Sequence, residues 1–401
     1  MSSDPPSLHA APSSTEAVHA GRDDFRAEGV HAPPLDLSTT YPFQDLDDAA
    51  TSLDALAHGS PDAEEPVYSR LHNPTVSRCE KAVAALEDAA HCVAFGSGMA
   101  AVTASLLAAG MDDRHVVAVR PCYGTTDHLL STGLLGLDVA WTTPEGISDA
   151  VRDDTALVIV ETPANPTLQL VDLEAAAEQA GSVPMLVDST FAPPVLQRPL
   201  DHGATLSLHS ATKFLGGHGD VVGGVVSTND PDWAERLRQV RVMTGALLHP
   251  MAAYLMHRSM PTLPARVQCA QSTAQTLADR LAANSALSTV HYPGLQASPL
   301  LGTQMDGPGT MISFDVGDPD AARCILQNTD LITPAVSLGA VDSLIQHPAS
   351  LTHGVVDETA RERSGITPGL LRLSVGLEDA DDLWHDLSTA IDAAKQAVPS
   401  P

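Results

Sequence analysis

The chain has 401 residues and carries 21 Lys and Arg against 50 Asp and Glu, a formal net charge of −29. This charge disfavours a nucleic-acid partner, because binding a phosphate backbone requires a basic patch, and it equally disfavours an anionic membrane surface. Hydrophobic residues make up 43% of the chain, which is sufficient for a core. At about 150 residues per domain, the length suits two domains.

The sequence also lacks the usual signals for membranes and secretion. It contains no apolar run of about 18 residues or more, and it begins without the basic and apolar segments of a secretory signal. The cysteines are scattered, odd in number and free of CxxC spacing, at Cys79, Cys92, Cys122, Cys269 and Cys324. This arrangement matches neither a disulfide framework nor a zinc motif. We therefore expect a cytoplasmic protein with no membrane partner and no bound metal.

The amino-acid composition and hydrophobic pattern of the chain change near residue 66. Residues 1–65 are rich in Pro, Ser, His and Asp, and we expect them to form an N-terminal arm without a core of its own. Helical patterns then alternate with short apolar runs that end in a polar residue, a pattern typical of parallel strands covered on both faces. We expect helices over 76–90, 99–109 and 172–180, and strands over 115–119, 157–161, 185–188 and 206–209.

The pattern changes again after residue 255. A long helix is expected over 263–287, followed by strands near 288–295 and over 311–316. A polar loop region at 333–369, a strand over 370–377 and a closing amphipathic helix over 379–398 complete the chain. These elements predict a smaller α/β domain.

One lysine that closely follows two hydroxyl side chains is the most informative feature. Lys213 is one of three lysines in the chain, follows Ser210 and Thr212, and precedes a glycine-rich stretch at 216–223. Such an amine can form a Schiff base with an aldehyde cofactor, whose phosphate the hydroxyls and nearby N–H groups then bind. A surface lysine beside a glycine turn is the alternative.

Two further segments favour the cofactor interpretation. The turn 96–98 lies directly before an Ala-rich helix, and a helix N-terminus is a ready anion site. Asp188 ends an apolar strand, where a carboxylate can pair with a pyridine nitrogen. A capping role in the next turn is the alternative for Asp188.

In this order and spacing, the three segments resemble pyridoxal-phosphate (PLP) enzymes of fold type I. Within that fold the chain is similar to the Cys/Met-metabolism (transsulfuration) family, which includes cystathionine γ-synthase, cystathionine γ- and β-lyases, methionine γ-lyase and O-acylhomoserine sulfhydrylase. Matching stretches lie at 68–75, 95–101, 122–126, 161–167, 187–194, 209–224, 337–353 and 370–379.

The resemblance spans residues 35–390 and implies an α/β fold. A large PLP-binding domain (66–255) would hold a mostly parallel seven-stranded sheet between helices. A smaller C-terminal α/β domain (256–401) would follow it, and the arm (1–65) would contact a neighbouring subunit.

The resemblance also implies how the cofactor is bound. Lys213 would form the Schiff base with PLP and transfer protons, Asp188 would pair with the pyridine nitrogen, and Tyr123 would stack on the ring and assist proton transfer. The cofactor's phosphate would be bound by Gly98, Met99, Ser210 and Thr212.

Further residues are implied to bind the substrate or a second subunit. Arg372 would bind the α-carboxylate of an amino-acid substrate, with Ser337 and Asn165 nearby. Tyr68 and Arg70 would reach the phosphate in a neighbouring subunit. The active site would therefore be shared in a homotetramer built as a pair of dimers.

The family resemblance leaves the reaction type open. Val336 stands where cystathionine-handling members commonly have Glu, which favours an uncharged thioether substrate. Thr125 and the pair Arg241–Val242 depart from the methionine γ-lyase pattern, and the segment 256–266 departs from the family's usual one. We expect γ- or β-elimination from a sulfur-containing amino acid, which releases a thiol, ammonia and a 2-oxo acid.

Two alternatives remain. One is a γ-replacement synthase acting on an O-acylhomoserine-type substrate. The other is a non-catalytic PLP-binding paralogue, against which the presence of Lys213, Asp188, Tyr123 and Arg372 together argues.

Overall fold

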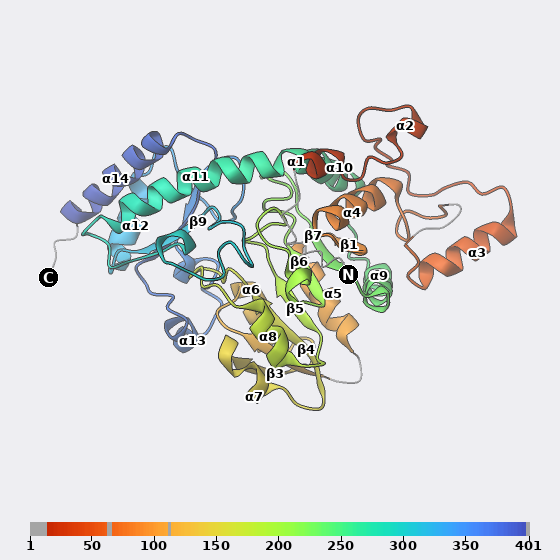
Figure 1. The fold of residues 1–401 in the computed structure, drawn as a ribbon, viewed down its shortest axis with the longest axis horizontal. Coiled ribbons are helices and arrows are strands. Elements are labelled where there is room, and N and C mark those ends of the chain that lie inside the picture. Colours follow the sequence, from red (N-terminus) through yellow and green to blue (C-terminus); the bar gives the residue numbers. More distant parts are fainter. Residues whose placement is uncertain (1–13, 62–65, 111–113, 398–401) are drawn as a thin grey trace, which may run out of the picture.

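Two β-sheets organise the chain in a computed structural model that describes residues 14–61, 66–110 and 114–397 (Figure 1). The larger sheet has seven strands in the order β1-β7-β6-β5-β4-β2-β3. Within it only β7 runs antiparallel to its neighbours, so the predicted mostly parallel sheet is confirmed. Its strands are β1 (His91–Phe95), β2 (His115–Val119), β3 (Asp138–Thr142), β4 (Thr155–Glu161), β5 (Met185–Asp188), β6 (Leu206–His209) and β7 (Gly224–Thr228).

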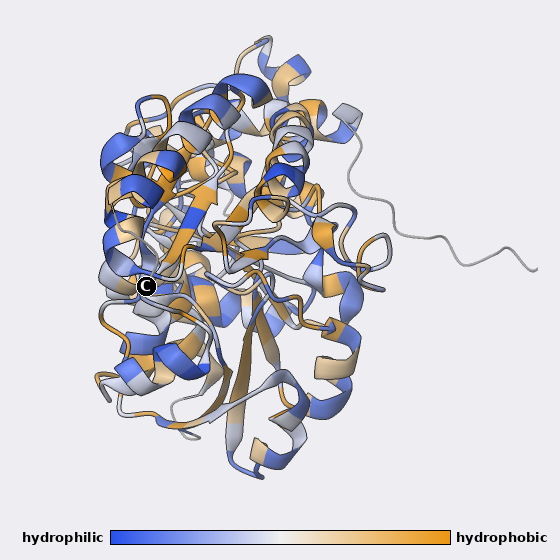
Figure 2. Cartoon of the chain, turned by 90° about the vertical axis from the view of Figure 1, so that its left-hand side faces the viewer, coloured by the Kyte–Doolittle hydropathy of each residue, from blue (hydrophilic) through white to orange (hydrophobic). Residues whose placement is uncertain are grey.

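Helices cover both faces of this sheet, as the continuous apolar runs predict. Alternate residues of β4 separate into two clusters: Leu157 and Ile159 pack towards α5 and α9, whereas Val158 and Val160 pack towards α7 and α8. In Figure 2 the strands in the interior are mostly hydrophobic, while single helices carry both hydrophobic and hydrophilic residues.

The chain contains these α-helices: α1 (Ser14–His19), α2 (Phe25–Glu28), α3 (Leu46–Ala57), α4 (Pro74–Leu86), α5 (Gly98–Ala109), α6 (Gly124–Ser131), α7 (Ile147–Ala150), α8 (Leu173–Ala180), α9 (Pro231–Thr244), α10 (Pro250–Ser259), α11 (Leu263–Ala282), α12 (Pro319–Asn328), α13 (Glu358–Arg363) and α14 (Ala380–Ala397). Several of these helices are capped at the N-terminus by a side chain that accepts backbone hydrogen bonds. Asn73 accepts from the N–H groups of Thr75 and Val76 while Pro74 takes the first helical position of α4.

The smaller sheet lies beside the long helix α11 and is covered by α12 and α14 (Figure 1). Its order is β10-β11-β12-β9-β8. Its strands are β8 (Thr289–His291), β9 (Met311–Asp315), β10 (Thr333–Pro334), β11 (Leu344–Gln346) and β12 (Leu370–Ser374). Side chains such as Phe314 and Leu371 are fully buried between this sheet and the helices.

Some sequence expectations need correction. The region 333–369 was expected to be loop, but it contains β10, β11 and α13, because strands of two or three residues carry too little periodicity to detect. The helix expected over 263–287 ends at Ala282 and the strand expected over 370–377 ends at Ser374. β1 and β3 were not expected as separate strands.

The N-terminal arm packs partly on its own chain. Arg78 of α4 pairs with Asp24 (2.5 Å) and Glu28 (3.0 Å), while Phe25 lies between Arg78 and His257. The arm's predicted end at residue 65 lies outside the described residues, and the predicted boundary at 255/256 falls inside α10. The division into domains therefore stays a prediction. No helix among the described residues is long and apolar enough to cross a membrane.

Candidate active site

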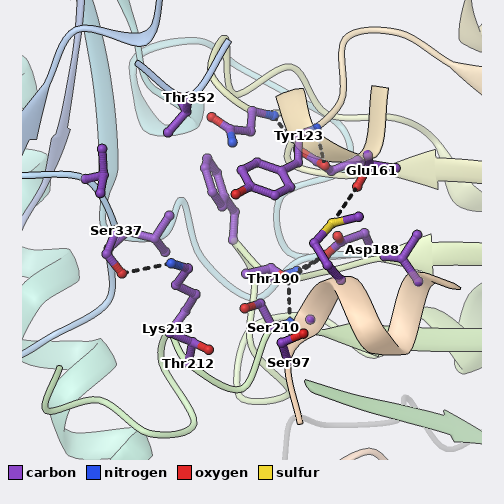
Figure 3. A pocket seen from close by; sticks show the side chains of 18 of the residues that line it. Ser97, Tyr123, Glu161, Asp188, Thr190, Ser210, Thr212, Lys213, Ser337 and Thr352 are labelled. Atoms are coloured by element: carbon purple, nitrogen blue, oxygen red, sulfur yellow. Dashed lines mark hydrogen bonds between the residues drawn. The ribbon is translucent and has the colours of Figure 1, made fainter. Parts of the chain in front are cut away.

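A cavity of about 500 Å³ lies where the carboxyl ends of β4, β5 and β6 face the smaller sheet (Figure 3). In parallel α/β sheets, ligands bind at these strand ends. The N-terminus of α5 forms one wall, and residues 336–338, 351–352 and Arg372 form the opposite wall. The cavity brings together Gly98, Met99, Tyr123, Asn165, Asp188, Ser210, Thr212, Lys213, Val336, Ser337 and Arg372, which are eleven of the thirteen residues predicted for the site.

Lys213 projects into this cavity from the loop after β6. Its Nζ donates a hydrogen bond to Ser337 Oγ (2.8 Å) across the cavity. Burial lowers the pKa of Lys213 to about 8, with a further contribution from the positive charge of Arg372. Ser337 itself has φ of 91°, a left-handed conformation that is uncommon for a residue with a side chain. The structure thus supplies an amine whose lowered pKa lets it lose its proton near pH 8.

The N-terminus of α5 faces the same cavity. Ser97 caps the helix by accepting from Ala100 N (3.0 Å), and the N–H groups of Gly98 and Met99 have no acceptor inside the helix. A Cβ on Gly98 would lie 2.9 Å from Ser210, so the close approach of the helix to Ser210 requires glycine. Thr212 exchanges hydrogen bonds with the backbone of Gly223 at 3.1 and 3.2 Å. The N–H groups of Gly98 and Met99 and the hydroxyl of Ser210 therefore converge where an anion can bind, whereas the Thr212 hydroxyl donates to the Gly223 carbonyl.

Arg372 of β12 is 2% exposed and lines the cavity. Its guanidinium donates to Asn165 Oδ1 (2.8 Å) and to the carbonyl of Ser337 (3.0 Å). Within the described chain no carboxylate is among its hydrogen-bond partners. Burial lowers the pKa of Arg372 to about 10, which still leaves it positively charged at neutral pH. The site therefore presents a buried positive charge to a carboxylate ligand.

Glu161 is a site residue to which the sequence analysis gave no role. Its two carboxylate oxygens accept separate backbone hydrogen bonds, from Tyr123 N (2.7 Å) and from Asn165 N (2.6 Å). It ends β4 directly opposite Asp188 in the β4–β5 register. Burial, followed by the nearby Asp188, raises the pKa of Glu161 well above its usual value, whereas the two hydrogen bonds oppose that rise. Glu161 thus fixes two loops that line the cavity. Its position at the end of an apolar strand is the sequence feature that could have indicated a role in the site.

We expect Glu161→Gln to lower kcat/KM about tenfold, because an amide nitrogen cannot accept one of the two backbone N–H groups. Steady-state kinetics measures kcat/KM, and a thermal-denaturation curve shows whether the variant is still folded. Glu378→Gln is the matched control, since Glu378 accepts from Ser343 N (2.7 Å) and Ser343 Oγ (2.9 Å) away from the cavity. Equal kinetic losses in both variants would contradict a local role for Glu161.

The loop that carries Tyr123 is also held from the opposite side. His353 bonds the carbonyl of Cys122 (3.3 Å), and burial lowers the pKa of His353 to about 4, so its imidazole is neutral at physiological pH. A Cβ on Gly124 would lie 2.0 Å from the carbonyl oxygen of Thr352, so only glycine permits this approach. The thiol of Cys122 is buried, which raises its pKa and makes it a poor nucleophile.

Tyr68 and Arg70 are the two predicted site residues that do not line the cavity of their own chain. Arg70 donates to the carbonyl of Val242 (3.1 Å), and its guanidinium lies 5.5 Å from the centre of the Tyr68 ring. Tyr68 is 43% exposed. The predicted contact with a neighbouring subunit's phosphate stays a prediction.

The histidines near Lys213 have partners other than a metal. His209 bonds Glu87 (2.5 Å) in the interior, and His218 bonds the carbonyl of Gly216 (2.9 Å). In the part of the chain that the structure describes, no group of three or more His, Cys, Asp or Glu side chains is arranged to hold a metal ion.

Comparisons with known proteins show the family to which the chain belongs. The model of the family described as Cys/Met metabolism PLP-dependent enzyme matches residues 14–392. The L-methionine gamma-lyase of Brevibacterium sandarakinum is 55% identical over 391 residues, which cover 96% of this chain and 98% of that protein. The cystathionine gamma-lyase of Bacillus subtilis is 41% identical over 335 residues, which cover 81% and 88%.

A solved structure shows the same similarity in three dimensions. The cystathionine gamma synthase from Xanthomonas oryzae pv. oryzae, solved in complex with aminoacrylate and cysteine, matches with a TM-score of 0.87 and 35% identity. The match covers 96% of this chain and 99% of that one. The fold class and the family resemblance expected from the sequence are both confirmed.

Proposed function

Since the chain belongs to the family of Cys/Met-metabolism PLP-dependent enzymes, we propose that it catalyses γ-elimination from L-methionine, which consumes one water and gives methanethiol, ammonia and 2-oxobutyrate. As a member of this family it is a PLP-dependent carbon–sulfur lyase that acts on a sulfur-containing amino acid. The choice of methionine, the roles of single residues and the assembly state are the proposed parts.

The residues around the cavity fit PLP in three respects. Lys213 provides a buried amine for the aldehyde, and Asp188 provides a carboxylate for the pyridine nitrogen. The N–H groups of Gly98 and Met99 and the hydroxyl of Ser210 provide donors for the phosphate, and the Thr212 hydroxyl would join them by turning away from the Gly223 carbonyl. When bound, PLP supplies an electron sink that stabilises negative charge at the substrate's Cα.

We assign the remaining work of the reaction to three side chains. Arg372 binds the substrate's α-carboxylate and so orients Cα and Cβ towards Lys213, since both Arg372 and the Lys213 amine bond Ser337. Lys213 accepts the proton that leaves Cα and, after it has released that proton, accepts the one that leaves Cβ, for which a pKa of about 8 is suited. Tyr123 lines the opposite side and donates a proton to the departing sulfur.

The observation that carries the choice of methionine is the absence of charge on the substrate's side-chain wall. The cavity residues with charged side chains are Glu161, Asp188, Lys213 and Arg372. Each has a partner other than the substrate's side chain: the first bonds backbone N–H groups, the next two are assigned to the cofactor, and the last is assigned to the α-carboxylate. Among the described residues, the wall that remains is formed by uncharged side chains such as Val336, Leu351 and Thr352. A distal ammonium or carboxylate group would lose its hydration there without gaining a partner, whereas a thioether would not.

The purified holoenzyme with L-methionine tests this proposal. We expect 2-oxobutyrate and methanethiol from L-methionine alone, and a lower kcat/KM with L-cystathionine, whose second amino-acid end is charged. Turnover of O-acetyl-L-homoserine only when a thiol is added would instead establish a γ-replacement synthase and contradict the proposal.

Exposed residues on the arm, in the segment directly after it and on α9 support a shared active site. Tyr68, Leu37, Phe43 and Met243 are each more than two-fifths exposed although they are hydrophobic or aromatic. Such a surface favours burial against another copy of the chain, where Tyr68 and Arg70 would complete the neighbour's phosphate site. We propose a homotetramer made of two such dimers.

The free state of all five cysteines supports a cytoplasmic location.

The state of the Lys213 amine predicts the pH dependence of cofactor binding. The neutral amine is the nucleophile, and the pKa of Lys213 is lowered from 10.5 to about 8, so the reactive fraction rises as pH increases through about 8. We expect the rate at which the apoenzyme recombines with PLP to rise with a midpoint near pH 8. A rate that continued to rise towards pH 10 or above would contradict the lowered pKa.

A further inference from the structure

One hydroxyl group connects the end of β5 with the loop that carries Lys213. Thr190 Oγ1 donates to Asp188 Oδ1 (2.5 Å), and the backbone N–H of Ser210 donates to Thr190 Oγ1 (2.8 Å) (Figure 3). The N–H of Thr190 also donates to Asp188 Oδ1 (3.0 Å). The first and third of these bonds form a local turn, but the bond from Ser210 joins residues that are 20 positions apart.

This network leaves specific atoms for a ligand. Both hydrogen bonds from Thr190 go to Oδ1 of Asp188, and within the described chain no hydrogen bond engages Oδ2. Asp188 lines the cavity, so Oδ2 is the oxygen that remains for a donor there. The N–H of Ser210 is already used by Thr190, which leaves its hydroxyl for the phosphate end of the cavity.

The same bonds influence the charge of Asp188. Burial raises the pKa of this carboxyl, and the two hydrogen bonds from Thr190 oppose the rise by favouring the ionised form. An ionised carboxylate is the form that attracts a protonated pyridine nitrogen. Thr190 therefore influences both the orientation and the charge of its partner.

We propose that Thr190 is a positioning residue for the cofactor. Its hydroxyl holds Asp188 and the backbone of Ser210 in one fixed arrangement, so that the carboxylate and the phosphate site bind opposite ends of the same molecule. Thr190 acts through Asp188 and Ser210 and needs no contact with the substrate. This inference rests on the proposed function, because it requires PLP in the cavity.

Two substitutions at this position test the proposal. Thr190→Val keeps the shape but removes the hydroxyl, and we expect the Kd for PLP to rise about ten- to a hundredfold, since hydrogen bonds to charged groups contribute most. The pH at which the visible absorbance of the bound cofactor changes should also shift. Thr190→Ser restores the hydroxyl and should return both quantities to within about threefold of the parent values.

Thr228→Val is the control, because the Thr228 hydroxyl also donates one hydrogen bond and accepts one from a backbone N–H but lies outside the cavity. It donates to Thr205 O (2.8 Å) and accepts from Asp230 N (3.1 Å) at the far end of β7. We expect this variant to lose thermal stability while its PLP affinity and absorbance stay unchanged.

The outcomes separate the inference from the function on which it rests. If Thr190→Val binds PLP as tightly as the parent and shows the same absorbance, or if Thr190→Ser does not recover, the positioning role is wrong although the enzyme still uses PLP. If the parent protein itself neither binds PLP nor changes its absorbance on adding it, the proposed function is wrong and the inference fails with it.

Discussion

Lys213→Ala is expected to reduce kcat for L-methionine about 10⁴-fold or more, because it removes both the amine that holds the cofactor and the base that moves protons. The assay is the release of 2-oxobutyrate under saturating substrate and added PLP. Within the described residues, Nζ of Lys213 bonds one hydroxyl, Ser337 Oγ. We therefore expect Lys213→Ala to change the free energy of unfolding little, although kcat falls steeply.

Lys395→Ala provides the control for this experiment. Lys395 is half-exposed on α14 and pairs with Asp392 (2.9 Å), so its replacement should leave kcat unchanged. Substantial activity in Lys213→Ala, with a folded protein and a tightly bound cofactor, would contradict the assignment of Lys213 as the base.

Arg372→Leu is expected to give the second-largest effect. Removing the buried guanidinium leaves the substrate carboxylate without its charged partner, so kcat/KM should fall about 10³-fold, or about 4 kcal/mol. The loss should appear mainly in KM if the carboxylate is bound equally in the ground and transition states. Arg372→Lys keeps the charge but not the planar fork and should recover only part of the loss.

Arg238→Leu is the matched control for this variant. Arg238 is also buried and donates to the carbonyl of Gly59 (3.2 Å), but it does not line the cavity. We expect lower thermal stability with an unchanged KM. If Arg372→Leu gave the same result, the assignment of Arg372 as the carboxylate site would be wrong.

The chemistry of the site was largely predictable because its signals are local in the chain. Lys213 lies beside two hydroxyl residues and a glycine-rich stretch, and Asp188 ends an apolar strand, so each carries its own context. Glu161 and Thr190 were quoted within matching stretches but received no role. Their functions depend on hydrogen bonds to Tyr123 and Ser210, which lie 38 and 20 positions away, and no local pattern indicates these partners.

The fold was predictable to the extent that its elements are long and periodic. The apolar runs at 115–119 and 185–188 coincide with β2 and β5, because strands buried on both faces are continuous in sequence. The expected helix over 263–287 was too long because the chain turns at Asn284, whose side chain accepts from Ala286 N (3.1 Å). An asparagine that caps a turn is not distinguished from one inside a helix by hydrophobic spacing alone.

The measurement that tests the account most directly is the location of the bound cofactor on the chain. Borohydride reduction of the PLP-loaded protein fixes the cofactor to the amine that holds it, and peptide mass spectrometry then identifies the residue. With lysines at Lys81, Lys213 and Lys395 alone, the three candidates fall in separate parts of the sequence. We predict the added mass on the peptide that contains Lys213, and its loss when L-methionine is added before reduction. A label on Lys81 or Lys395, or no label at all, would contradict the assignment of this cavity as the active site.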